Sequence, residues 1–362
     1  MLFITSILLF SGLLTGLALV LIVAERLLVN YGDCKIDVNA GKRTIEVKGG
    51  QPLLSVLNQE QLFIPSACGG KGSCGYCKIT VLSGGGQVLP TELPYLSRKE
   101  LRSMVRLACQ VKIREDMQVR VPDELLDVKL FTATVESVVS LTRDMKEINL
   151  VLNDPPEISQ LPGQYVQVQV PSRKEVFRAY SMSSPVYEKN KVSLVVRVVP
   201  GGLCSVYLFN LKQGEVVKFT GPFGEFRWNE DPSTDFICVG GGSGMAPMRN
   251  IIYSLYDRWH DRNCWLFFGC RTMDDVFYLD EYKKLSREHP NFHVVYALSE
   301  EKNPDKSWDG ETGFIHLSVD KYLEPGGKRQ AFLCGPPPMI EAVMRVLEKK
   351  GVKQSDMFYD KF

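Results

Sequence analysis

The sequence predicts a multidomain α+β protein with four parts: an N-terminal transmembrane helix, a small β-grasp domain, an antiparallel β-barrel and an α/β doubly wound domain. Three observations lead to this prediction. Residues 2–24 form an uncharged apolar run, three cysteines crowd into a glycine-rich loop at 68–77, and strand and helix patterns begin to alternate at about residue 233.

The composition is that of a globular protein with ordinary cores. The chain has 362 residues, of which 44% are hydrophobic, and its 43 Lys and Arg nearly balance its 42 Asp and Glu. A formal net charge of +1 gives no reason to expect a nucleic-acid partner. Of the ten cysteines, four belong to one motif and the other six are scattered along a long chain, which is typical of a reducing, cytoplasmic compartment rather than of a disulfide scaffold.

The apolar run at 2–24 is expected to anchor the chain in a lipid bilayer. As a helix it would span about 34 Å at roughly 1.5 Å per residue, which exceeds a bilayer core of about 30 Å. A cleaved signal peptide is the alternative, but the run lacks a basic start and a clear cleavage site. Arg26 follows the helix and no Lys or Arg precedes it, so the positive-inside rule predicts a single-pass protein of the inner membrane with its domains in the cytoplasm.

The loop "CGGKGSCGYC" predicts a metal centre. Cys68, Cys74 and Cys77 have the spacing C-x5-C-x2-C, and Cys109 follows in "RLACQVKI". Zinc sites usually combine two close pairs of ligands, whereas three ligands in one loop and a remote fourth are typical of a plant-type [2Fe–2S] cluster. Glycines between the cysteines can adopt positive φ and bring backbone N–H groups close to the cluster sulfurs.

The segments around this loop predict a β-grasp ferredoxin domain over 33–125. "KIDVN" and "RTIEV" read as a hairpin, "PLLSVLNQE" as a helix, and "KITVLSG" and "MQVRV" as strands. Arg98, Arg102 and Arg106 recur every four residues, so on one helix they would form a basic face. That face is either simply solvated or a docking surface for an acidic electron acceptor.

Residues 128–226 predict an FAD-binding β-barrel. Alternating strands such as "QYVQVQV" and "VSLVVRVV" lie between Pro and Gly turns. In "RAYSMSS", Arg178 offers a charged fork to a pyrophosphate, Tyr180 an aromatic face to the flavin ring, and Ser181 a hydroxyl to a ring nitrogen. The turn "PGGLCS" adds further candidate contacts from Gly202, Cys204 and Ser205, and "GPFGEF" at 221–226 closes the barrel.

Residues 233–362 predict a dinucleotide-binding domain. An apolar strand runs into "GGGSGMAPM" and then a helix, the arrangement that holds a phosphate near a helix N-terminus. The candidate residues of this loop are Gly241, Gly242, Gly244, Met245, Ala246 and Pro247. A later strand ends in Cys334, Gly335 and Pro336, which would lie at the C-terminal edge of the sheet, where ligands bind.

The same domain is expected to prefer NADH. The second strand runs into Arg271, and Asp274 and Asp275 follow closely. If this loop contacts the adenosine ribose, the negative charge of the two aspartates would repel the 2′-phosphate of NADPH.

Together these motifs resemble the ferredoxin–NADP reductase superfamily and, within it, the F subunits of the sodium-translocating NADH:quinone oxidoreductases. The resemblance covers nearly the whole chain in the same order, including "RAYSM", "GPFGEF", "SWDGETGFIH" and "CGPPPM". It implies hydride transfer from NADH to FAD and single-electron transfer through the cluster toward other membrane subunits of a respiratory complex and quinone. Ser181 and Cys334, which their own motifs nominate, are the candidate catalytic residues, and by the same resemblance Phe362 would shield the flavin ring until nicotinamide displaces it.

Two other functions remain open on the sequence. A reductase that feeds another membrane complex or an oxygenase would use the same three motifs, although reductases of soluble oxygenases usually have x4 between the first two cysteines. A carrier with a dead nicotinamide site is the alternative outside enzymes, and the intact "GGGSGMAPM" and "CGPPPM" runs argue against it. Coupling to sodium transport would need partner subunits, because a single helix has no ion path of its own.

Overall fold

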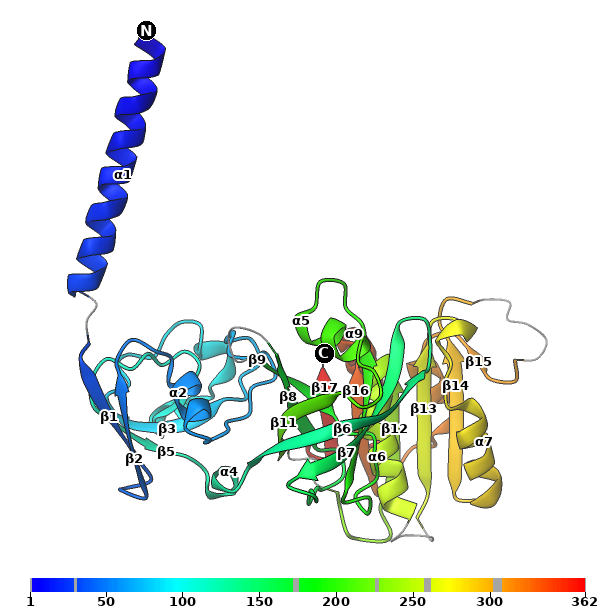
Figure 1. Ribbon diagram of the computed structural model, residues 1–362. Coiled ribbons are helices and arrows are strands. Elements are labelled where there is room, and N and C mark those ends of the chain that lie inside the picture. Colours follow the sequence, from blue (N-terminus) through cyan, green and yellow to red (C-terminus); the bar gives the residue numbers. More distant parts are fainter. Residues whose placement is uncertain are drawn as a thin grey trace. The chain divides into compact units, whose positions relative to one another are not determined.

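The structure is a computed structural model that describes residues 2–28, 31–171, 176–224, 228–256, 262–301 and 308–361 (Figure 1). It divides into two compact units, Met1–Val128 and Lys129–Phe362, and each unit is described by itself.

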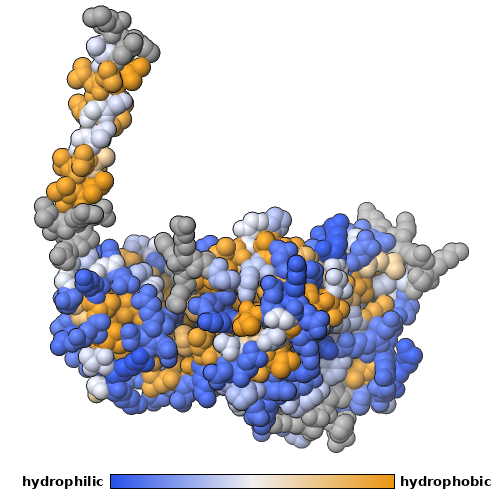
Figure 2. Space-filling view, viewed as in Figure 1, coloured by the Kyte–Doolittle hydropathy of each residue, from blue (hydrophilic) through white to orange (hydrophobic). Residues whose placement is uncertain are grey.

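Helix α1 spans Leu2–Leu28, slightly beyond the predicted range. Its segment Thr5–Val23 is long and apolar enough to cross a membrane by length and composition. The side chains of this segment are exposed, and Figure 2 shows most of them in the colours of apolar residues. The Thr15 hydroxyl donates to the carbonyl of Ser11 at 2.7 Å, so a polar group of the helix is satisfied within the helix.

The rest of the first unit is a five-stranded sheet in the order β2-β1-β5-β3-β4, as expected for a β-grasp domain. The strands are β1 (Asp33–Val38), β2 (Arg43–Lys48), β3 (Lys78–Ser83), β4 (Val105–Leu107) and β5 (Met117–Arg120). The helices are α2 (Leu53–Gln59), η1 (Leu93–Tyr95), α3 (Arg98–Arg102) and α4 (Asp123–Leu126). The predicted hairpin is confirmed, because β1 and β2 pair antiparallel with Ile36 opposite Ile45.

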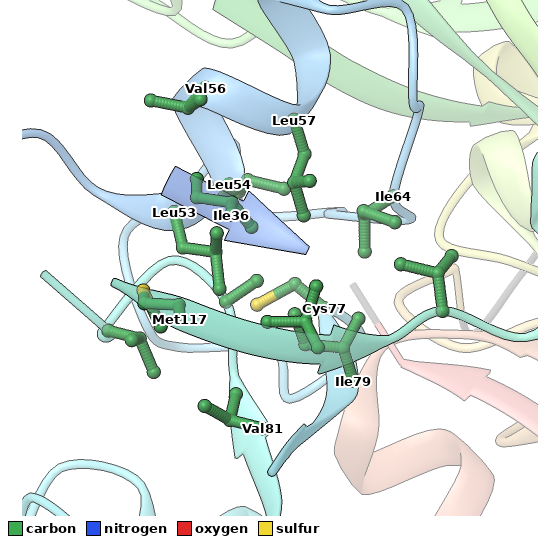
Figure 3. Close-up of a cluster of buried hydrophobic side chains, with 14 of the residues drawn as sticks. Ile36, Leu53, Leu54, Val56, Leu57, Ile64, Cys77, Ile79, Val81 and Met117 are labelled. Atoms are coloured by element: carbon green, nitrogen blue, oxygen red, sulfur yellow. The ribbon is translucent and has the colours of Figure 1, made fainter. Parts of the chain in front are cut away.

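The core of this unit lies between α2 and the sheet. Leu53, Leu54 and Leu57 of α2 are buried, and Figure 3 shows them close to Ile36 and Cys77. Alternate residues of β1 and β3 are buried in this core, as the period of two requires. Cys77, which directly precedes β3, is therefore held by the rigid part of the domain.

The second unit begins with a six-stranded antiparallel sheet in the order β10-β7-β6-β11-β8-β9. Its strands are β6 (Lys129–Ser140), β7 (Met145–Asp154), β8 (Tyr165–Val170), β9 (Val176–Ser181), β10 (Lys191–Arg197) and β11 (Val216–Phe223). A bridge between Met182 and Leu194 joins the two edges, so the sheet curls into the predicted barrel. Helix α5 (Leu203–Phe209) packs Leu208 into the barrel core. Glu225 and Phe226 of "GPFGEF" lie outside the described residues.

The second sheet of this unit is parallel, in the order β15-β14-β13-β12-β16-β17. Its strands are β12 (Asp235–Gly241), β13 (Cys264–Cys270), β14 (Phe292–Leu298), β15 (Glu311–Thr312), β16 (Arg329–Gly335) and β17 (Met357–Lys361). The helical segments are η2 (Gly242–Gly244), α6 (Met245–Tyr256), η3 (Met273–Asp275), α7 (Leu279–Glu288), α8 (Ile315–Tyr322), α9 (Pro337–Lys349) and η4 (Gln354–Asp356).

Helices cover both faces of the parallel sheet, as a doubly wound fold requires. Helices α6 and α7 contribute to one core, and α8 and α9 to the other. The register pairs Gly240 with Cys334 and Gly241 with Gly269, so three central strands end together. Two of the residues at these ends, Gly241 and Cys334, are among those that the sequence nominates for dinucleotide binding.

Candidate functional site

The four predicted cluster ligands lie as two pairs of thiols. The Sγ atoms of Cys68 and Cys74 are 3.4 Å apart. The thiols of Cys77 and Cys109 are in hydrogen-bond contact, and the N–H of Ala108, next to Cys109, donates to the Cys77 carbonyl. Within the described ranges, no three or more His, Cys, Asp or Glu side chains converge on a point that a single metal ion could occupy. Two pairs of thiols fit a binuclear cluster, because two cysteines can hold each of its irons.

The glycines of the cluster loop have the backbone conformation that the sequence predicts. Gly69, Gly70, Gly72 and Gly75 have φ between 64° and 84°, a region that side chains with a Cβ rarely adopt. A Cβ on Gly72 would also lie 2.5 Å from Nε2 of Gln110. The loop therefore needs glycine for its conformation and, at Gly72, for space.

One thiol of each pair is stabilised as the thiolate, while its partner is not: contact with Cys68 raises the pKa of Cys74, and contact with Cys109 raises the pKa of Cys77. The thiol of Cys74 and the N–H groups of Lys71 and Ser73 lower the pKa of Cys68 to about 3. Contact with the Cys77 thiol and then with the Gln110 amide lowers the pKa of Cys109 to about 7, against the effect of burial. Because iron binds the thiolate form of cysteine, this donor set fits the cluster.

The prediction that three arginines share one basic face is wrong for Arg106. Helix α3 contains Arg98 and Arg102 but ends before Met104, whose φ is 56°. Arg106 instead lies in β4 with its side chain 6% exposed, in a salt bridge of 2.7 Å with Glu92, which is 0% exposed. Its guanidinium also donates to the carbonyls of the 85–87 loop. Arg106 is thus a core residue of the domain and contributes nothing to a basic surface.

Three candidate flavin residues share one neighbourhood. Arg178 and Tyr180 lie on β9 two residues apart and so on one face of the strand, while Ser181 lies on the other face. The Tyr180 hydroxyl and the Cys204 thiol share a hydrogen bond, and the Arg178 charge acts on both groups. Burial raises the pKa of Cys204 to about 11, so its thiol is neutral at physiological pH.

The turn before α5 contains close contacts between its backbone and the Ser205 side chain. The Ser205 hydroxyl accepts from the N–H of Val199 at 3.1 Å, and a Cβ on Gly202 would lie 2.5 Å from that oxygen. Gly201 has φ 72°. The turn brings Cys204 beside Tyr180, but the Ser205 hydroxyl already has a backbone partner within the turn.

The nucleotide loop passes close to the end of a neighbouring strand. A Cβ on Gly244 would lie 2.1 Å from the carbonyl oxygen of Cys334, so only glycine fits there. Gly242 has φ 56°, and a Cβ at this position would lie 3.2 Å from the guanidinium of Arg197. Glycine therefore leaves room for the Arg197 side chain. Met245, Ala246 and Pro247 then form the buried first turn of α6.

A cavity of about 410 Å³ opens at the C-terminal edge of the parallel sheet. Five of the residues that the sequence singles out line it: Gly241, Gly242, Arg271, Asp275 and Pro336. Its other lining residues include three that the sequence did not single out: Arg197, Phe314 and His316. Arg197 comes from the end of β10 in the barrel, where Asp144 holds it at 3.3 Å, so no local signal in the sequence connects it with this cavity.

Arg271 is engaged by one of the two nominated aspartates. Its Nε and a terminal nitrogen donate to the two carboxylate oxygens of Asp275, each at 3.0 Å. Although burial opposes ionisation, these bonds hold the pKa of the Asp275 carboxyl below its usual value. The charge of Arg271 is thereby neutralised at the cavity wall.

The end of β16 places two further candidates. Cys334 is 1% exposed, and burial raises the pKa of its thiol well above the usual value. Gly335 has φ 150°, and Pro336 precedes α9. Lys361 pairs with Gly335 at the edge of the sheet, and Phe362, which follows it, lies outside the described residues.

Three domain families match the chain in the order of these sites. They are a 2Fe-2S iron-sulfur cluster binding domain over residues 36–114, an oxidoreductase FAD-binding domain over 132–228 and an oxidoreductase NAD-binding domain over 238–345. The first range contains the four cluster cysteines, the second the candidate flavin residues, and the third the residues of the cavity apart from Arg197, which lies in the second range.

Similar proteins extend the match to the whole chain. The F subunit of the Na(+)-translocating NADH-quinone reductase of Neisseria gonorrhoeae is 35% identical, with 99% of each chain covered. The corresponding protein of Pseudomonas aeruginosa is 35% identical, with 98% of this chain and 97% of the relative covered.

Among solved structures, the Amycolatopsis cytochrome P450 reductase GcoB has a TM-score of 0.72 at 30% identity, covering 91% of this chain and 98% of that one. The ferredoxin reductase in carbazole 1,9a-dioxygenase has a TM-score of 0.68 at 28% identity, with the same coverage. When bound, FAD accepts hydride from NADH and the [2Fe–2S] cluster carries the electrons onward one at a time. With matching domains and relatives over its whole length, the chain belongs to the family of F subunits of Na(+)-translocating NADH-quinone reductases, within the ferredoxin–NADP reductase superfamily, and is an NADH oxidoreductase.

Proposed function

We propose that the chain is the NADH-oxidising subunit of a membrane complex that reduces quinone and moves sodium. The observation that supports this most is the match to the F subunits over 99% of both chains, anchor helix included. The chain would take two electrons from NADH and deliver them singly to other subunits. Sodium movement would occur in those subunits, since the described part of this chain offers one apolar helix.

In this proposal the barrel holds FAD through residues of β9 and the turn before α5. Arg178 would bind the pyrophosphate, Tyr180 would pack on the flavin ring, and Ser181 would donate to a ring nitrogen. Gly202, Cys204 and Ser205 would contribute phosphate contacts; the hydrogen bond between Tyr180 and Cys204 supports a shared site. Because Ser205 bonds to the N–H of Val199, its backbone is a better candidate ligand than its hydroxyl.

The cavity at the end of the parallel sheet is proposed to bind NADH. The loop from Gly241 to Pro247 would hold the pyrophosphate, assisted by Arg197 from the barrel, whose guanidinium lines the cavity. Arg271 would contact the adenosine ribose with its charge already paired. Cys334, Gly335 and Pro336 would border the nicotinamide, and Phe362 would cover the flavin until nicotinamide displaces it.

We further propose that residues 2–24 cross the inner membrane once and leave the catalytic domains in the cytoplasm. The apolar Thr5–Val23 segment supports the anchor, and the basic residue on its C-terminal side supports the orientation. We also propose that the ferredoxin domain covers residues 33–125, the FAD-binding domain 128–226 and the NADH-binding domain 233–362.

Rapid mixing of the purified, FAD-loaded chain with NADH tests the enzyme assignment. The flavin should bleach and the cluster should then be reduced, faster with NADH than with NADPH. A flavin that does not bleach would contradict the proposal, and equal rates with NADPH would contradict the nucleotide preference.

A second candidate function is electron supply to an oxygenase, which the similarity to a P450 reductase favours. Detergent purification of the native complex separates the two functions. Membrane subunits that reduce quinone should accompany the chain, and an accompanying oxygenase would favour the second function instead.

A further inference from the structure

Helix α6 is hydrogen-bonded to the barrel by polar side chains. The Asn250 carboxamide accepts from the N–H of Gly163 at 2.7 Å and donates to Gln160 at 3.2 Å and to the carbonyl of Ser184. Asn250 itself is fully buried. All three partners belong to barrel segments, so one side chain of the nucleotide domain fixes two separate parts of the flavin domain.

Arg249, which precedes Asn250, forms a second, ionic connection in the same region. We call this region the seam; it consists of Arg249, Asn250 and Ser254 of α6 and their barrel partners. The Arg249 guanidinium lies 3.1 Å from Glu281 of α7 and 3.9 Å from Glu147 of β7, and it donates to the carbonyl of Ser183 at 3.3 Å. The rings of two tyrosines lie 4.9 and 5.3 Å from it; these are Tyr253 and Tyr278. Because these groups enclose the guanidinium, the Arg249 side chain is held in one orientation.

One turn further along α6, Ser254 accepts from the N–H of Val186 at 3.2 Å. The barrel partners at 183–186 follow directly after β9, which carries Tyr180 and Ser181. The helix partners follow directly after the glycine loop that lines the nucleotide cavity. The seam thus joins the chain next to the flavin residues to the chain next to the dinucleotide loop.

We propose that Asn250 and Arg249 are positioning residues, which set the approach of nicotinamide to the flavin without touching either; this inference rests on the function proposed above. The step they serve breaks a C–H bond of NADH, moves the hydrogen with two electrons to the flavin, and leaves NAD⁺. Its rate depends steeply on the distance between the two rings, and a displacement of about 1 Å costs roughly 100-fold.

The test compares four variants of the full, FAD-loaded chain in detergent: Asn250→Ala, Ser254→Ala, Arg249→Lys and the control Asn291→Ala. Asn250→Ala removes the three seam contacts of Asn250, and Ser254→Ala removes one contact without creating a buried charge. Asn291→Ala is the matched control, because Asn291 bonds to the carbonyl of Arg262 at 2.7 Å, next to the opposite end of the sheet. FAD content, NAD⁺ affinity and the rate of flavin reduction at saturating NADH are measured for each.

We expect Asn250→Ala to retain FAD, to bind NAD⁺ within about threefold of wild type, and to reduce its flavin roughly 10-fold more slowly or worse. Ser254→Ala should slow reduction by a smaller factor, and Asn291→Ala should match wild type. A wild-type reduction rate in Asn250→Ala would overturn the inference. If that variant loses FAD, unchanged rates in Ser254→Ala and in Arg249→Lys would overturn it. Failure of wild type to reduce its flavin would instead overturn the proposed function.

Discussion

At the scale of single residues, Gln110 connects a cluster ligand to the rest of its domain. Its Nε2 lies 3.6 Å from the Sγ of Cys109, and its Oε1 accepts from the hydroxyl of Thr91 at 2.9 Å. Hydrogen bonds to the ligand sulfurs stabilise the more negative, reduced cluster and raise its potential. Gln110 is therefore expected to set the potential of the cluster without being a ligand.

Replacing Gln110 by Leu should lower the midpoint potential of the cluster. One net hydrogen bond contributes about 1 kcal/mol, which for one electron is roughly 40 mV. A redox titration followed by electron paramagnetic resonance measures the shift. Thr91→Val is the control, because it leaves the amide donor in place and should move the potential much less; an unchanged potential in Gln110→Leu would contradict the assignment.

A second residue-scale prediction concerns the choice of nucleotide. The Asp275 carboxylate neutralises Arg271 at the cavity wall through two bonds of 3.0 Å. In Asp275→Asn the guanidinium is free to bind the 2′-phosphate of NADPH. A charge-assisted hydrogen bond of about 1.5 kcal/mol should raise kcat/KM for NADPH roughly tenfold relative to NADH.

The neighbouring aspartate supplies the control for that experiment. Asp274 forms no ion pair with Arg271 in the salt bridges of the described residues, so Asp274→Asn should change the ratio much less. Steady-state kinetics with both nucleotides measures it. An equal change in the two variants would mean that overall negative charge, rather than the Arg271 pair, selects NADH.

At the scale of elements, β4 is fixed by a buried ion pair. Arg106 contacts Glu92 and three loop carbonyls, while a carboxylate oxygen of Glu92 accepts from the N–H of Leu107 at 2.9 Å. Arg106→Met would leave the Glu92 carboxylate buried without a counter-charge, which costs roughly 3–5 kcal/mol of unfolding free energy. Denaturant unfolding of the full chain, followed by the visible circular dichroism of the cluster, measures the loss. Arg102→Met, on exposed α3, should change it by less than about 0.5 kcal/mol.

The same pair predicts a dependence on pH. Burial opposes the charge of Glu92, but its hydrogen bonds with Arg106 hold the pKa of the carboxyl below its usual value. The ionised Glu92 carboxyl therefore makes its full contribution to stability at pH values above the pKa that it has in the unfolded chain. That contribution decreases as the pH falls through the pKa that it has in the folded protein. The stability difference between wild type and Glu92→Gln should be largest near neutral pH and shrink in acid. A difference that grows in acid would contradict the direction of the shift.

The sequence predicts a feature of the fold or of the site where neighbouring residues alone determine it. The four cysteines, the glycines with positive φ and the strand alternation are such cases, because covalent spacing and backbone conformation are written in neighbouring residues. Arg106 departs from the prediction because its four-residue spacing from Arg102 continues past the left-handed Met104, which ends the helix. Arg197 is not predictable because its place in the cavity depends on how barrel and sheet pack, and a strand pattern carries no such information.

At the scale of the whole molecule, the division of the chain separates two kinds of chemistry. The cluster ligands lie in the unit ending at Val128, and the flavin and dinucleotide residues lie in the unit beginning at Lys129. Each unit has its own hydrophobic core. Reduction of the flavin by NADH should therefore be independent of the cluster, whereas onward transfer should depend on it.

Cys74→Ala tests this separation, because it removes one thiol of the Cys68 pair and with it the cluster. Anaerobic mixing with NADH should still bleach the flavin within about twofold of the wild-type rate, while the cluster signal and one-electron transfer beyond the flavin are lost. Cys34→Ala is the matched control, since Cys34 is a buried thiol of the same unit outside the cluster loop. It should keep the cluster signal. If flavin reduction slowed in Cys74→Ala alone, the two units would not act independently, and the cluster domain would have to contribute to the hydride-transfer step.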